Sequence, residues 1–374
     1  MVIAVNTRLL QKGKLEGIGW FTLETLRRIT TGHREHQFIF IFDRPFDKDY
    51  LFSDNITPVV LPPPTRHPFL WYIWFQFQIP RVLKRYKADL FLSPDGYLSL
   101  RTKVPQLAVI HDVNFVHRPD DLPWLTAKYY NYFFPKFAKI ARRIATVSLY
   151  SKEDITRWFK VDYDKIDVVY DGINQAFTPT SKEEQEQTRK KYTDGHEYFL
   201  FIGALHPRKN ISGLLKAFDA FKSVDKKGVK LVIVGGEMFK TGEIYETYSN
   251  MRAANDVVFT GRVHSKELHQ ILGAGLALTF VPFFEGFGIP IIEAMSAGIP
   301  VICSNTTSIP EVGGNAVVYA DPCRIDEIAE AMITLANDEN LRKELVAKGN
   351  IQKEKFSWDE TARKLWISVE KSLQ

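Results

Sequence analysis

Short β-rich runs alternate with helical stretches from one end of the chain to the other, and this alternation restricts the fold more than any other feature. It is typical of parallel α/β architecture, in which a helix follows each strand. The first half of the chain predicts strands at 2–5, 38–42, 58–61, 88–92, 106–110, 144–147 and 166–169. The second half predicts them at 198–202, 230–234, 257–260, 276–281, 300–303 and 316–319. We therefore expect two doubly wound sheets, with a cleft between two domains as the default active site.

A polar, charged stretch at 178–197 interrupts the alternation between the two series of strands. A chain of 374 residues is long enough for two domains of ordinary size. We therefore predict a first domain at 1–172 and a second domain at 173–358.

The composition of the chain indicates its cellular compartment and the kinds of ligand that suit it. Met1 leads directly into a strand-like run without a basic region or a cleavage site, so no signal peptide is visible. No apolar run is long enough to cross a membrane. Two cysteines, Cys303 and Cys323, argue against a disulfide framework and suit the reducing cytoplasm. The net charge of +5 suits an enzyme that binds anionic substrates or works beside anionic lipid, and falls short of a nucleic-acid-binding protein.

The most informative segment runs from 284 to 301 and follows an apolar strand. Glu285 lies in the loop at the carboxyl end of that strand, where Gly286 and Gly288 let the backbone approach a ligand closely. The proline after this turn predicts a helix, and Glu293 falls in its early part. Two carboxylates beside such a turn can accept hydrogen bonds from sugar and ribose hydroxyls. The alternative interpretation is a helix cap at Glu285 and a solvated surface residue at Glu293.

A second cluster follows the strand predicted at 198–202. It begins with Gly203 and contains Arg208 and Lys209, and Asn210 is a good N-cap for the helix that comes next. The two cations therefore lie at a helix N-terminus in the first βα turn, where a Rossmann-like unit binds anions. A departing nucleoside diphosphate gains negative charge that these cations can stabilise. The alternative interpretation is a solvated loop.

Two weaker signals lie in the first half. Gly17 and Gly19 form a short glycine turn between the first strand and an amphipathic helix, but they lack the lysine of a P-loop. His111 and Asp112 follow directly after the strand at 106–110, which is a favourable place for a binding site. His111 could instead only anchor the loop by hydrogen bonds, and we interpret Asp112 as a residue that supports the loop.

Other patterns carry less weight. The sequences Asp-Lys-Asp at 47–49 and Asp-Tyr-Asp at 162–164 look like metal-binding motifs, but neither follows a convincing buried strand. We interpret both as solvated turns. The aromatic stretch at 67–80, followed by the cations of 81–87, predicts a buried helix on the first sheet, with a helix on a membrane surface as the alternative.

These motifs together resemble the family-4 glycosyltransferases, a retaining group with the GT-B fold of two Rossmann-like domains facing a cleft. Glu285 and Glu293 reproduce the family's Glu-x7-Glu signature, together with the flanking Gly-Phe-Gly-x-Pro and the following Ala-x-Gly-x-Pro-Val. The resemblance implies that Glu285 contacts the donor sugar and that Glu293 binds the nucleotide ribose. It also implies that Phe287 lies in the donor-binding turn, and that a helix at 359–374 crosses back onto the first domain.

The resemblance extends to the other motifs. It implies that Gly17 and Gly19 face the donor from the first domain and that His111 lies against the donor sugar. It favours Lys209, and less strongly Arg208, as ligands of the diphosphate. Many relatives carry an arginine directly after the glycine, where this chain has Ala204.

The expected activity is the transfer of a hexose, with mannose from GDP-mannose as the first choice, to a glycan or lipid-linked acceptor with retention of configuration. The pattern, including 308–314, resembles bacterial mannosyltransferases of surface-polysaccharide assembly. No cofactor is expected because the nucleotide sugar is a substrate, and no metal because two cations and helix amides stabilise the leaving group. The alternatives are a UDP-hexose donor, a GT-B-fold epimerase, and a non-catalytic nucleotide-sugar-binding module.

Overall fold

The computed structural model describes residues 1–174, 176–238 and 241–374. Its contacts divide the chain into two units, Met1–Gly172 with Ser357–Gln374, and Ile173–Phe356. The first unit ends at the residue where the sequence analysis puts the domain boundary. The chain returns to the first unit at Ser357, two residues before the helix that was expected to do so.

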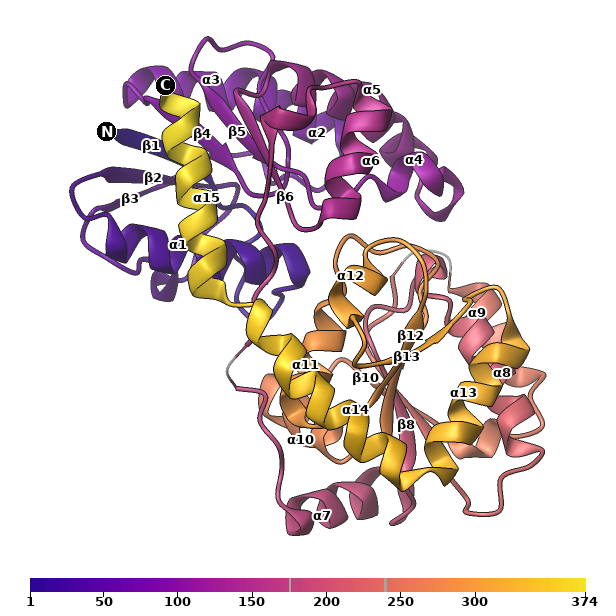
Figure 1. Cartoon of the computed structure of the whole chain (residues 1–374). Coiled ribbons are helices and arrows are strands. Elements are labelled where there is room, and N and C mark those ends of the chain that lie inside the picture. Colours follow the sequence, from indigo (N-terminus) through magenta and orange to yellow (C-terminus); the bar gives the residue numbers. More distant parts are fainter. Residues whose placement is uncertain (175, 239–240) are drawn as a thin grey trace. The chain divides into compact units, whose positions relative to one another are not determined.

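The first unit contains a seven-stranded parallel sheet with the order β3-β2-β1-β4-β5-β6-β7 (Figure 1). The strands are β1 (Val2–Asn6), β2 (Gln37–Phe42), β3 (Ile56–Val60), β4 (Leu90–Ser93), β5 (Gln106–Val109), β6 (Arg143–Thr146) and β7 (Ile166–Val168). The helices are α1 (Gly17–Gly32), α2 (Pro68–Ile73), a π-helical segment η2 (Trp74–Gln78), α3 (Ile79–Arg85), α4 (Asn114–His117), α5 (Trp124–Ile140), α6 (Leu149–Phe159) and α15 (Trp358–Leu373).

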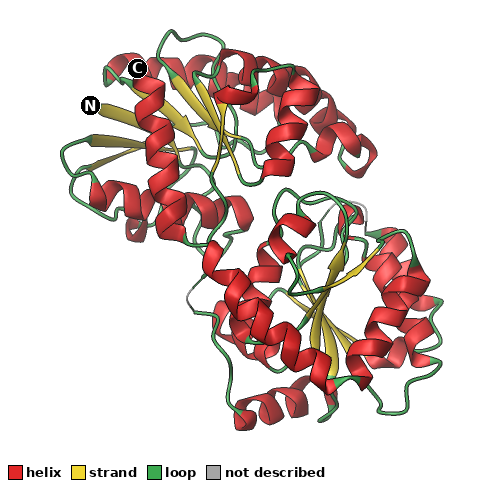
Figure 2. Cartoon of the chain, viewed as in Figure 1, coloured by secondary structure: helices red, strands yellow, loops and turns green. Residues whose placement is uncertain are grey.

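The second unit contains a six-stranded parallel sheet with the order β10-β9-β8-β11-β12-β13. The strands are β8 (Tyr198–Ile202), β9 (Lys230–Val234), β10 (Val257–Gly261), β11 (Ala277–Phe280), β12 (Val301–Ser304) and β13 (Val318–Ala320). The helices are α7 (Lys182–Thr193), α8 (Ile211–Lys222), α9 (Gly242–Ser249), α10 (Ser265–Gly273), α11 (Ile289–Ala297), α12 (Ile309–Gly313), α13 (Ile325–Asn337) and α14 (Glu339–Gln352). In each unit, helices cover the strands (Figure 2).

Continuous apolar runs produce these central strands. All five residues of β8 are buried, as are all four of β11. A strand that is buried on both faces needs helices on both sides of the sheet, and this arrangement requires the parallel crossovers that the alternation predicted. The predicted pair of doubly wound parallel sheets is confirmed.

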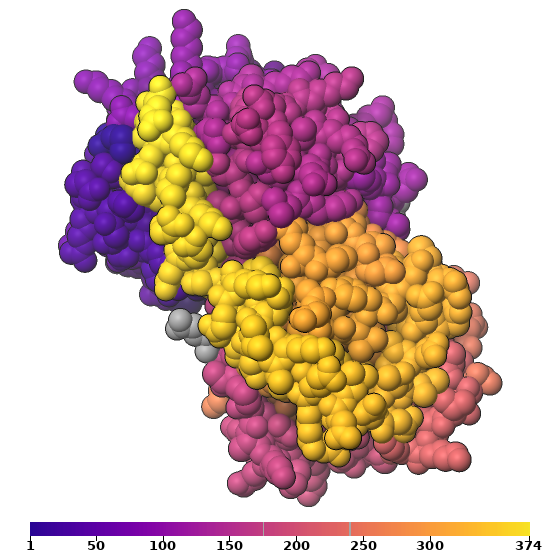
Figure 3. Space-filling model, in the orientation of Figure 1, coloured from indigo at the N-terminus to yellow at the C-terminus, as the bar shows by residue number. Residues whose placement is uncertain are grey.

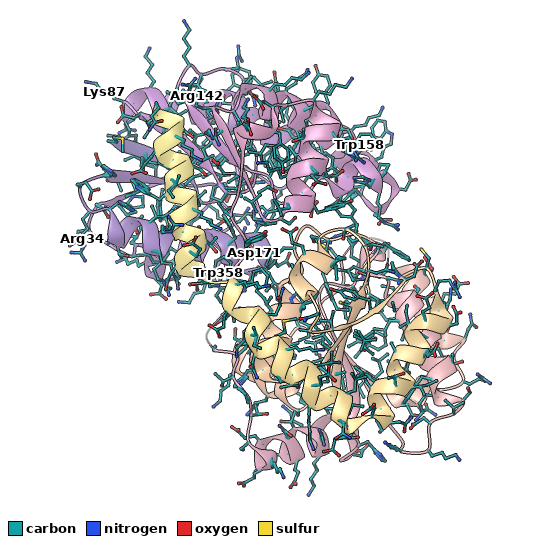
Figure 4. All side chains as sticks on the ribbon, viewed as in Figure 1. Arg34, Lys87, Arg142, Trp158, Asp171 and Trp358 are labelled. Atoms are coloured by element: carbon teal, nitrogen blue, oxygen red, sulfur yellow. The ribbon has the colours of Figure 1, made fainter. Side chains whose placement is uncertain are left out.

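The C-terminal helix α15 lies along the first unit and contacts α1 and strands β4 to β7 (Figures 1 and 3). Arg28 on α1 donates to Asp359, and the Thr361 hydroxyl donates to the backbone oxygen of Tyr170. A Cβ atom at Gly172 would lie only 2.2 Å from the backbone nitrogen of Trp358, so this close crossing of two chain segments requires glycine. Figure 4 labels Trp358 and the neighbouring Asp171.

Candidate active site

The strand order of the second sheet reverses between β8 and β11, which pair directly through Phe199–Ala277 and Leu200–Leu278. The loops that follow these two strands lead to helices on opposite faces of the sheet. Ligands of open α/β sheets bind at the carboxyl ends of the two strands that flank such a point, so the ends of β8 and β11 are the candidate site. Arg208 and Lys209 lie in the loop after β8, and Glu285 lies in the loop after β11.

Glu285 contacts both cations. Arg208 Nη1 donates to Glu285 Oε1 over 2.9 Å, and Lys209 Nζ donates to the same oxygen. The backbone joins the loops as well, because Phe283 N–H donates to the Arg208 carbonyl over 2.9 Å. The structure thus brings together three of the four residues predicted to be catalytic.

The electrostatics of the cluster keep Glu285 ionised. Burial alone would raise the pKa of this carboxyl, but the charges of Arg208 and Lys209 and their hydrogen bonds outweigh burial, and the pKa lies below its ordinary value. Glu285 is therefore a carboxylate across the neutral pH range. Its negative charge offsets part of the positive charge that the two cations could offer to a phosphate.

Two residues that the sequence analysis did not select hold the Glu285 loop in place. Glu285 N–H donates to Thr307 Oγ1 over 3.3 Å, and the Ser308 hydroxyl donates to the Glu285 carbonyl over 2.9 Å and to the Phe287 carbonyl over 3.2 Å. Thr307 adopts a φ of 56°. The run of hydroxyl residues directly after a buried strand was the signal that could have revealed them.

The remaining predicted donor-binding residues of this unit surround the same loops. Gly203 follows β8 directly, and Gly286 and Phe287 follow Glu285. Gly288 has a φ of 110° at the N-cap of α11, and a Cβ atom there would lie 2.9 Å from Ile309, so only glycine suits the position. Phe287 is buried, and its ring packs edge-on against Phe356 with centroids 5.4 Å apart.

Glu293 lies one turn into α11 and is half-buried. Within the described part of the chain, it makes no hydrogen bond or ion pair, unlike Glu285. Burial raises its pKa to about 8. The two glutamates of the motif therefore differ in chemistry, because one is held as an anion while the other takes up a proton near neutral pH.

The first turn of α8 lies beside the two cations. Asn210 occupies the N-cap position, but its side chain does not cap the helix, and this part of the sequence prediction is wrong. Its amide instead donates to the carbonyls of Val281 and Pro322, over 3.1 Å and 2.7 Å. Asn210 therefore ties the loops after β8, β11 and β13 together, and it leaves the first-turn amides of α8 to other acceptors.

In the first unit, His111 follows β5 and lies at the carboxyl edge of that sheet. Its Nε2 lies 2.8 Å from the Pro94 carbonyl, which can only accept, so Nε2 carries the proton and Nδ1 is the acceptor. Burial lowers the pKa of His111, although Pro94 and the carboxylates of Asp112 and Asp95 partly oppose that effect. His111 is thus a neutral imidazole that can accept a hydrogen bond. Asp112 accepts from Asn114 N–H over 2.9 Å and supports the loop, as predicted.

Gly17 and Gly19 do not form a separate turn. They lie within the first turn of α1, which begins at Gly17, so the predicted start of this helix was too late. Glycine in a helix interior lowers the stability of the helix. In the first turn this loss of stability is small, because the amides there have no intrahelical partner. The ring of Phe21, on the next turn, packs edge-on against His111 with centroids 4.9 Å apart.

The first unit also contains a buried polar network that the sequence analysis missed. Arg8, after β1, donates to Asp95, after β4, over 2.6 Å, and Asn6 donates to the same carboxylate over 2.7 Å. Nearby, the loops after β1, β2 and β3 line a cavity of about 400 Å³ that includes Lys12, Lys14, Arg44, Asp47 and Arg66. Polar residues immediately after β1 and β4 were the available signal, since strand ends at one sheet edge meet.

The two Asp-x-Asp sequences are turns, as predicted. Asp47 and Asp162 each accept a hydrogen bond from the backbone N–H two residues later. Over residues 1–174, 176–238 and 241–374, no group of three or more His, Cys, Asp or Glu side chains is arranged to hold a metal ion. In the same residues, no helix is both long and apolar enough to cross a membrane.

Comparisons with known proteins agree with this geometry. The family described as "Glycosyl transferases group 1" matches residues 181–352, and "Glycosyltransferase Family 4" matches residues 16–177. The O-antigen chain mannosyltransferase B of Escherichia coli is 30% identical over 278 residues, which are 74% of this chain and 73% of that protein. The chain is a family-4, group 1 glycosyltransferase.

Two further proteins are similar to this glycosyltransferase, one in sequence and one in fold. The O-antigen chain mannosyltransferase RfbU of Salmonella typhimurium is 28% identical over 256 residues, which are 68% of this chain and 67% of that protein. The solved sucrose-phosphate synthase of Thermosynechococcus elongatus has a TM-score of 0.77 at 15% identity and covers 99% of this chain, with 98% of its own chain aligned. At that identity the likeness concerns the fold alone, and the fold of the glycosyltransferase is GT-B.

Proposed function

We propose that this glycosyltransferase transfers mannose from GDP-mannose to a glycan or lipid-linked glycan, with retention of the anomeric configuration. The observation that carries the proposal is the cluster of Glu285, Arg208 and Lys209 at the point where the strand order of the second sheet reverses. The choice of mannose is supported by the relatives, which are named O-antigen mannosyltransferases. A UDP-hexose is the second donor to test.

In this proposal, Arg208, Lys209 and the first-turn amides of α8 bind the diphosphate of the donor. When the glycosidic bond to the phosphate breaks, negative charge grows on the leaving diphosphate. Cations that already lie in place stabilise that charge without the cost of reorganising solvent. Glu285 then accepts a hydrogen bond from a hydroxyl of the donor sugar, which orients the sugar against the cations.

Retention is proposed to follow from attack on the face of the sugar that the leaving group occupies. A double-displacement reaction would need a carboxylate that is free to attack the anomeric carbon. Glu285 is poorly suited to that role because one of its oxygens already accepts from both Arg208 and Lys209. The leaving phosphate would instead take the proton of the acceptor hydroxyl.

The other residues predicted to contact the donor are proposed to have the roles that the family resemblance implies. Glu293 binds the ribose, and His111 accepts a hydrogen bond from the donor sugar through Nδ1. The amino end of α1, with Gly17 and Gly19, faces the donor from the first unit. The acceptor is proposed to bind the first unit, where Lys14 and Arg66 line the cavity and suit an acceptor that carries phosphate.

The reaction is proposed to need neither a metal ion nor a cofactor, since Arg208 and Lys209 supply the charge that a metal supplies elsewhere. Transfer measured in excess chelator should proceed at the rate seen without it. Loss of activity in chelator, followed by recovery on adding magnesium or manganese, would contradict this part of the proposal.

The donor can be identified by a thermal-shift screen of nucleotide sugars, because a ligand that binds the folded chain raises its melting temperature. GDP-mannose should give a larger shift than UDP-glucose, UDP-galactose or UDP-N-acetylglucosamine. The same donor should be hydrolysed slowly in the absence of acceptor. A chain that binds the donor but never hydrolyses it would be a non-catalytic binding module, and one that changes the sugar's configuration without releasing it would be an epimerase.

A lipid-linked acceptor would require the enzyme to work at the cytoplasmic face of the membrane. We therefore include peripheral membrane association in the proposed function. The basic and aromatic residues of the stretch at 67–87 support it.

A further inference from the structure

The surface of α5 carries an alternating stripe of apolar and cationic side chains. Trp124, Lys128, Tyr132, Lys136 and Ile140 follow one another at four-residue spacing, so each lies beside the next, and the stripe turns gradually around a helix about 25 Å long. The three apolar members are 68%, 59% and 44% exposed. The ammonium of Lys128 lies 4.0 Å from the ring centroid of Trp124, and that of Lys136 lies 3.3 Å from the ring centroid of Tyr132.

The exposed aromatic surface continues from α5 onto α2 and the π-helical segment. Phe69, Tyr72 and Phe77 are exposed. The Tyr72 ring lies 5.8 Å from that of Phe133 on α5 and 5.9 Å from that of Phe77. The guanidinium of Arg101 lies 4.3 Å from the Phe77 ring. We call this surface, formed by α2, η2, Arg101 and the stripe on α5, the aromatic–basic face.

The opposite side of α2 and η2 forms part of the core. Trp74, Phe75 and Ile79 are fully buried, as the interpretation of this stretch as a buried helix predicted. The exposed rings of the aromatic–basic face are therefore not needed to fill the core. Large exposed apolar side chains that gather in one patch mark an interaction surface, in contrast to single exposed ones.

The charge around this face has one sign. Residues 66–88 contain five Lys and Arg but no Asp or Glu, and residues 122–152 contain six Lys and Arg but no Asp or Glu. The chain as a whole has 49 basic and 44 acidic residues, so the imbalance is local. Lys87 and Arg142, which precede β4 and β6, extend from the same edge of the first unit (Figure 4). Asp121, just before α5, is paired with Arg118.

We propose that the aromatic–basic face binds the surface of an anionic phospholipid bilayer. Tryptophan and tyrosine rings favour the headgroup region, where the ring is apolar and the polar atom stays wet. Lysine and arginine stems lie along the apolar surface while their charges reach lipid phosphates. The alternation of both kinds of side chain along α5 matches a surface that presents acyl chains and phosphates side by side.

This proposal rests on the peripheral association included in the proposed function and adds the surface and the lipid class. It can be tested without glycosyl transfer, by sedimenting the full chain with vesicles. One set contains phosphatidylglycerol in phosphatidylcholine, and the other contains phosphatidylcholine alone. The wild type should bind the anionic vesicles at least tenfold more tightly, and raised salt should remove most of that difference.

Two double variants separate the contributions of charge and ring. Lys128→Glu with Lys136→Glu should lower binding to anionic vesicles by at least tenfold, since each cation near an anionic surface contributes about a fivefold factor. Trp124→Ala with Tyr132→Ala should lower binding to both kinds of vesicle. The matched controls are Lys343→Glu and Tyr245→Ala, which alter exposed residues of the second unit and should bind as the wild type does.

Other results would contradict lipid binding or would identify a different partner for this face. The proposal is overturned if the wild type does not sediment with anionic vesicles. It is also overturned if the two double variants of the aromatic–basic face bind as the controls do. If the face variants instead abolish self-association measured by sedimentation velocity, a second copy of the chain occupies the face. Thermal unfolding checks that the variants fold. Donor hydrolysis in solution should be unchanged in all of them, and its absence in the wild type would count against the transfer reaction and not against lipid binding.

Discussion

Replacing Glu285 by glutamine removes the negative charge that Arg208 and Lys209 share in the absence of a ligand. A nucleoside diphosphate that binds these cations must do so beside the Glu285 carboxylate. The Glu285→Gln variant is therefore expected to bind free nucleoside diphosphate more tightly than the wild type. It should nevertheless transfer sugar more slowly, because a neutral amide accepts a hydrogen bond from a sugar hydroxyl less strongly than a carboxylate does.

The magnitude follows from the geometry of the cluster. Arg208 Nη1 lies 2.9 Å from Glu285 Oε1, and a phosphate oxygen accepted by the same nitrogen would lie roughly 5 Å from the carboxylate. Two unit charges at that separation repel by roughly 3 kcal/mol at an effective dielectric constant of about 20. The side chains of Arg208 and Glu285 are 23% and 10% exposed, so water and salt reach the site and weaken the repulsion. We expect a gain of about 1 kcal/mol, or about fivefold in affinity, after this screening.

Glutamine is a better choice than alanine for this test. Truncation to alanine would leave two partly buried cations without their partner, at a cost of about 3–5 kcal/mol in the free energy of unfolding for a fully buried pair. Glutamine keeps the shape and one hydrogen-bond acceptor. Turnover of the Glu285→Gln variant should fall roughly 10²-fold, the scale of losing one preorganised polar group.

Calorimetry with GDP on the wild type, Glu285→Gln and Glu293→Gln provides the decisive measurement. Glu293→Gln is the matched control because it makes the same chemical change on the same loop–helix unit, away from the cations. Above a pH of about 8, where Glu293 is ionised, Glu293→Gln should weaken nucleotide binding, whereas Glu285→Gln should strengthen it, most clearly at low salt. The reasoning is refuted if both variants lose affinity to the same extent, or if Glu285→Gln binds more weakly than the wild type.

Three further predictions use the same site and its surroundings. Lys209→Ala should lower steady-state turnover roughly 10²-fold, with Lys343→Ala as the exposed control, and a near-normal rate would make Lys209 a surface residue only. Because the pKa of Glu293 is raised to about 8, ribose binding by its carboxylate should make calorimetric nucleotide affinity rise with pH up to about 8, and Glu293→Gln should not show this rise. Burial raises the pKa of Asp171 to about 8, and its Oδ1 has no hydrogen-bond partner among the described residues. The folded chain thus holds a proton that the unfolded chain releases above a pH of about 4, so the free energy of unfolding should fall as the pH rises from about 4 to about 8, by at most about 1.4 kcal/mol per pH unit. Asp171→Asn should flatten that dependence in urea unfolding, and equal slopes in the two proteins would show that Asp171 is not buried in its neutral form.

The alternation of apolar runs and amphipathic stretches predicted both sheets because all central strands of a parallel sheet have one property in common. They are buried on both faces, so their apolar character is visible without knowledge of their neighbours. The strand at 198–202 was predicted with its final bounds. The order of strands was not predictable in this way, since β8 lies beside β11 and not beside β10, and that order brings the loops of the candidate site together.

Because the sequence pattern does not show which strands are neighbours, it revealed only part of the site. Glu285 and Lys209 could be selected because each follows a strand and precedes a helix. Their direct pairing, across 76 residues of sequence, depends on which strands are neighbours. Thr307 and Ser308 hold the loop through backbone atoms of Glu285 and Phe287, and no residue type is unique to that task.

The aromatic stretch at 67–80 shows a different limit. Its composition supported two interpretations, a buried helix and a surface helix, and the structure contains features of both. The π-helical turn at Trp74–Gln78 buries Trp74 and Phe75 and leaves Phe77 exposed. The four-residue stripe on α5 was visible in the sequence, but its contact with the Tyr72 surface came only from the packing of α2 against α5.

The return of the chain to the first unit has a consequence for how such enzymes can be recombined. The second unit is one continuous segment, Ile173–Phe356, and the first unit is assembled from both ends of the chain. In genetic terms, the second unit is an insertion between Gly172 and Ser357. A chimera with a single crossover at 172 would set a foreign α15 against the native α1 and would have to fit a new residue 358 against Gly172. An exchange of the whole 173–356 cassette keeps those contacts intact, so one gene could acquire a new second unit while its first unit stays unchanged.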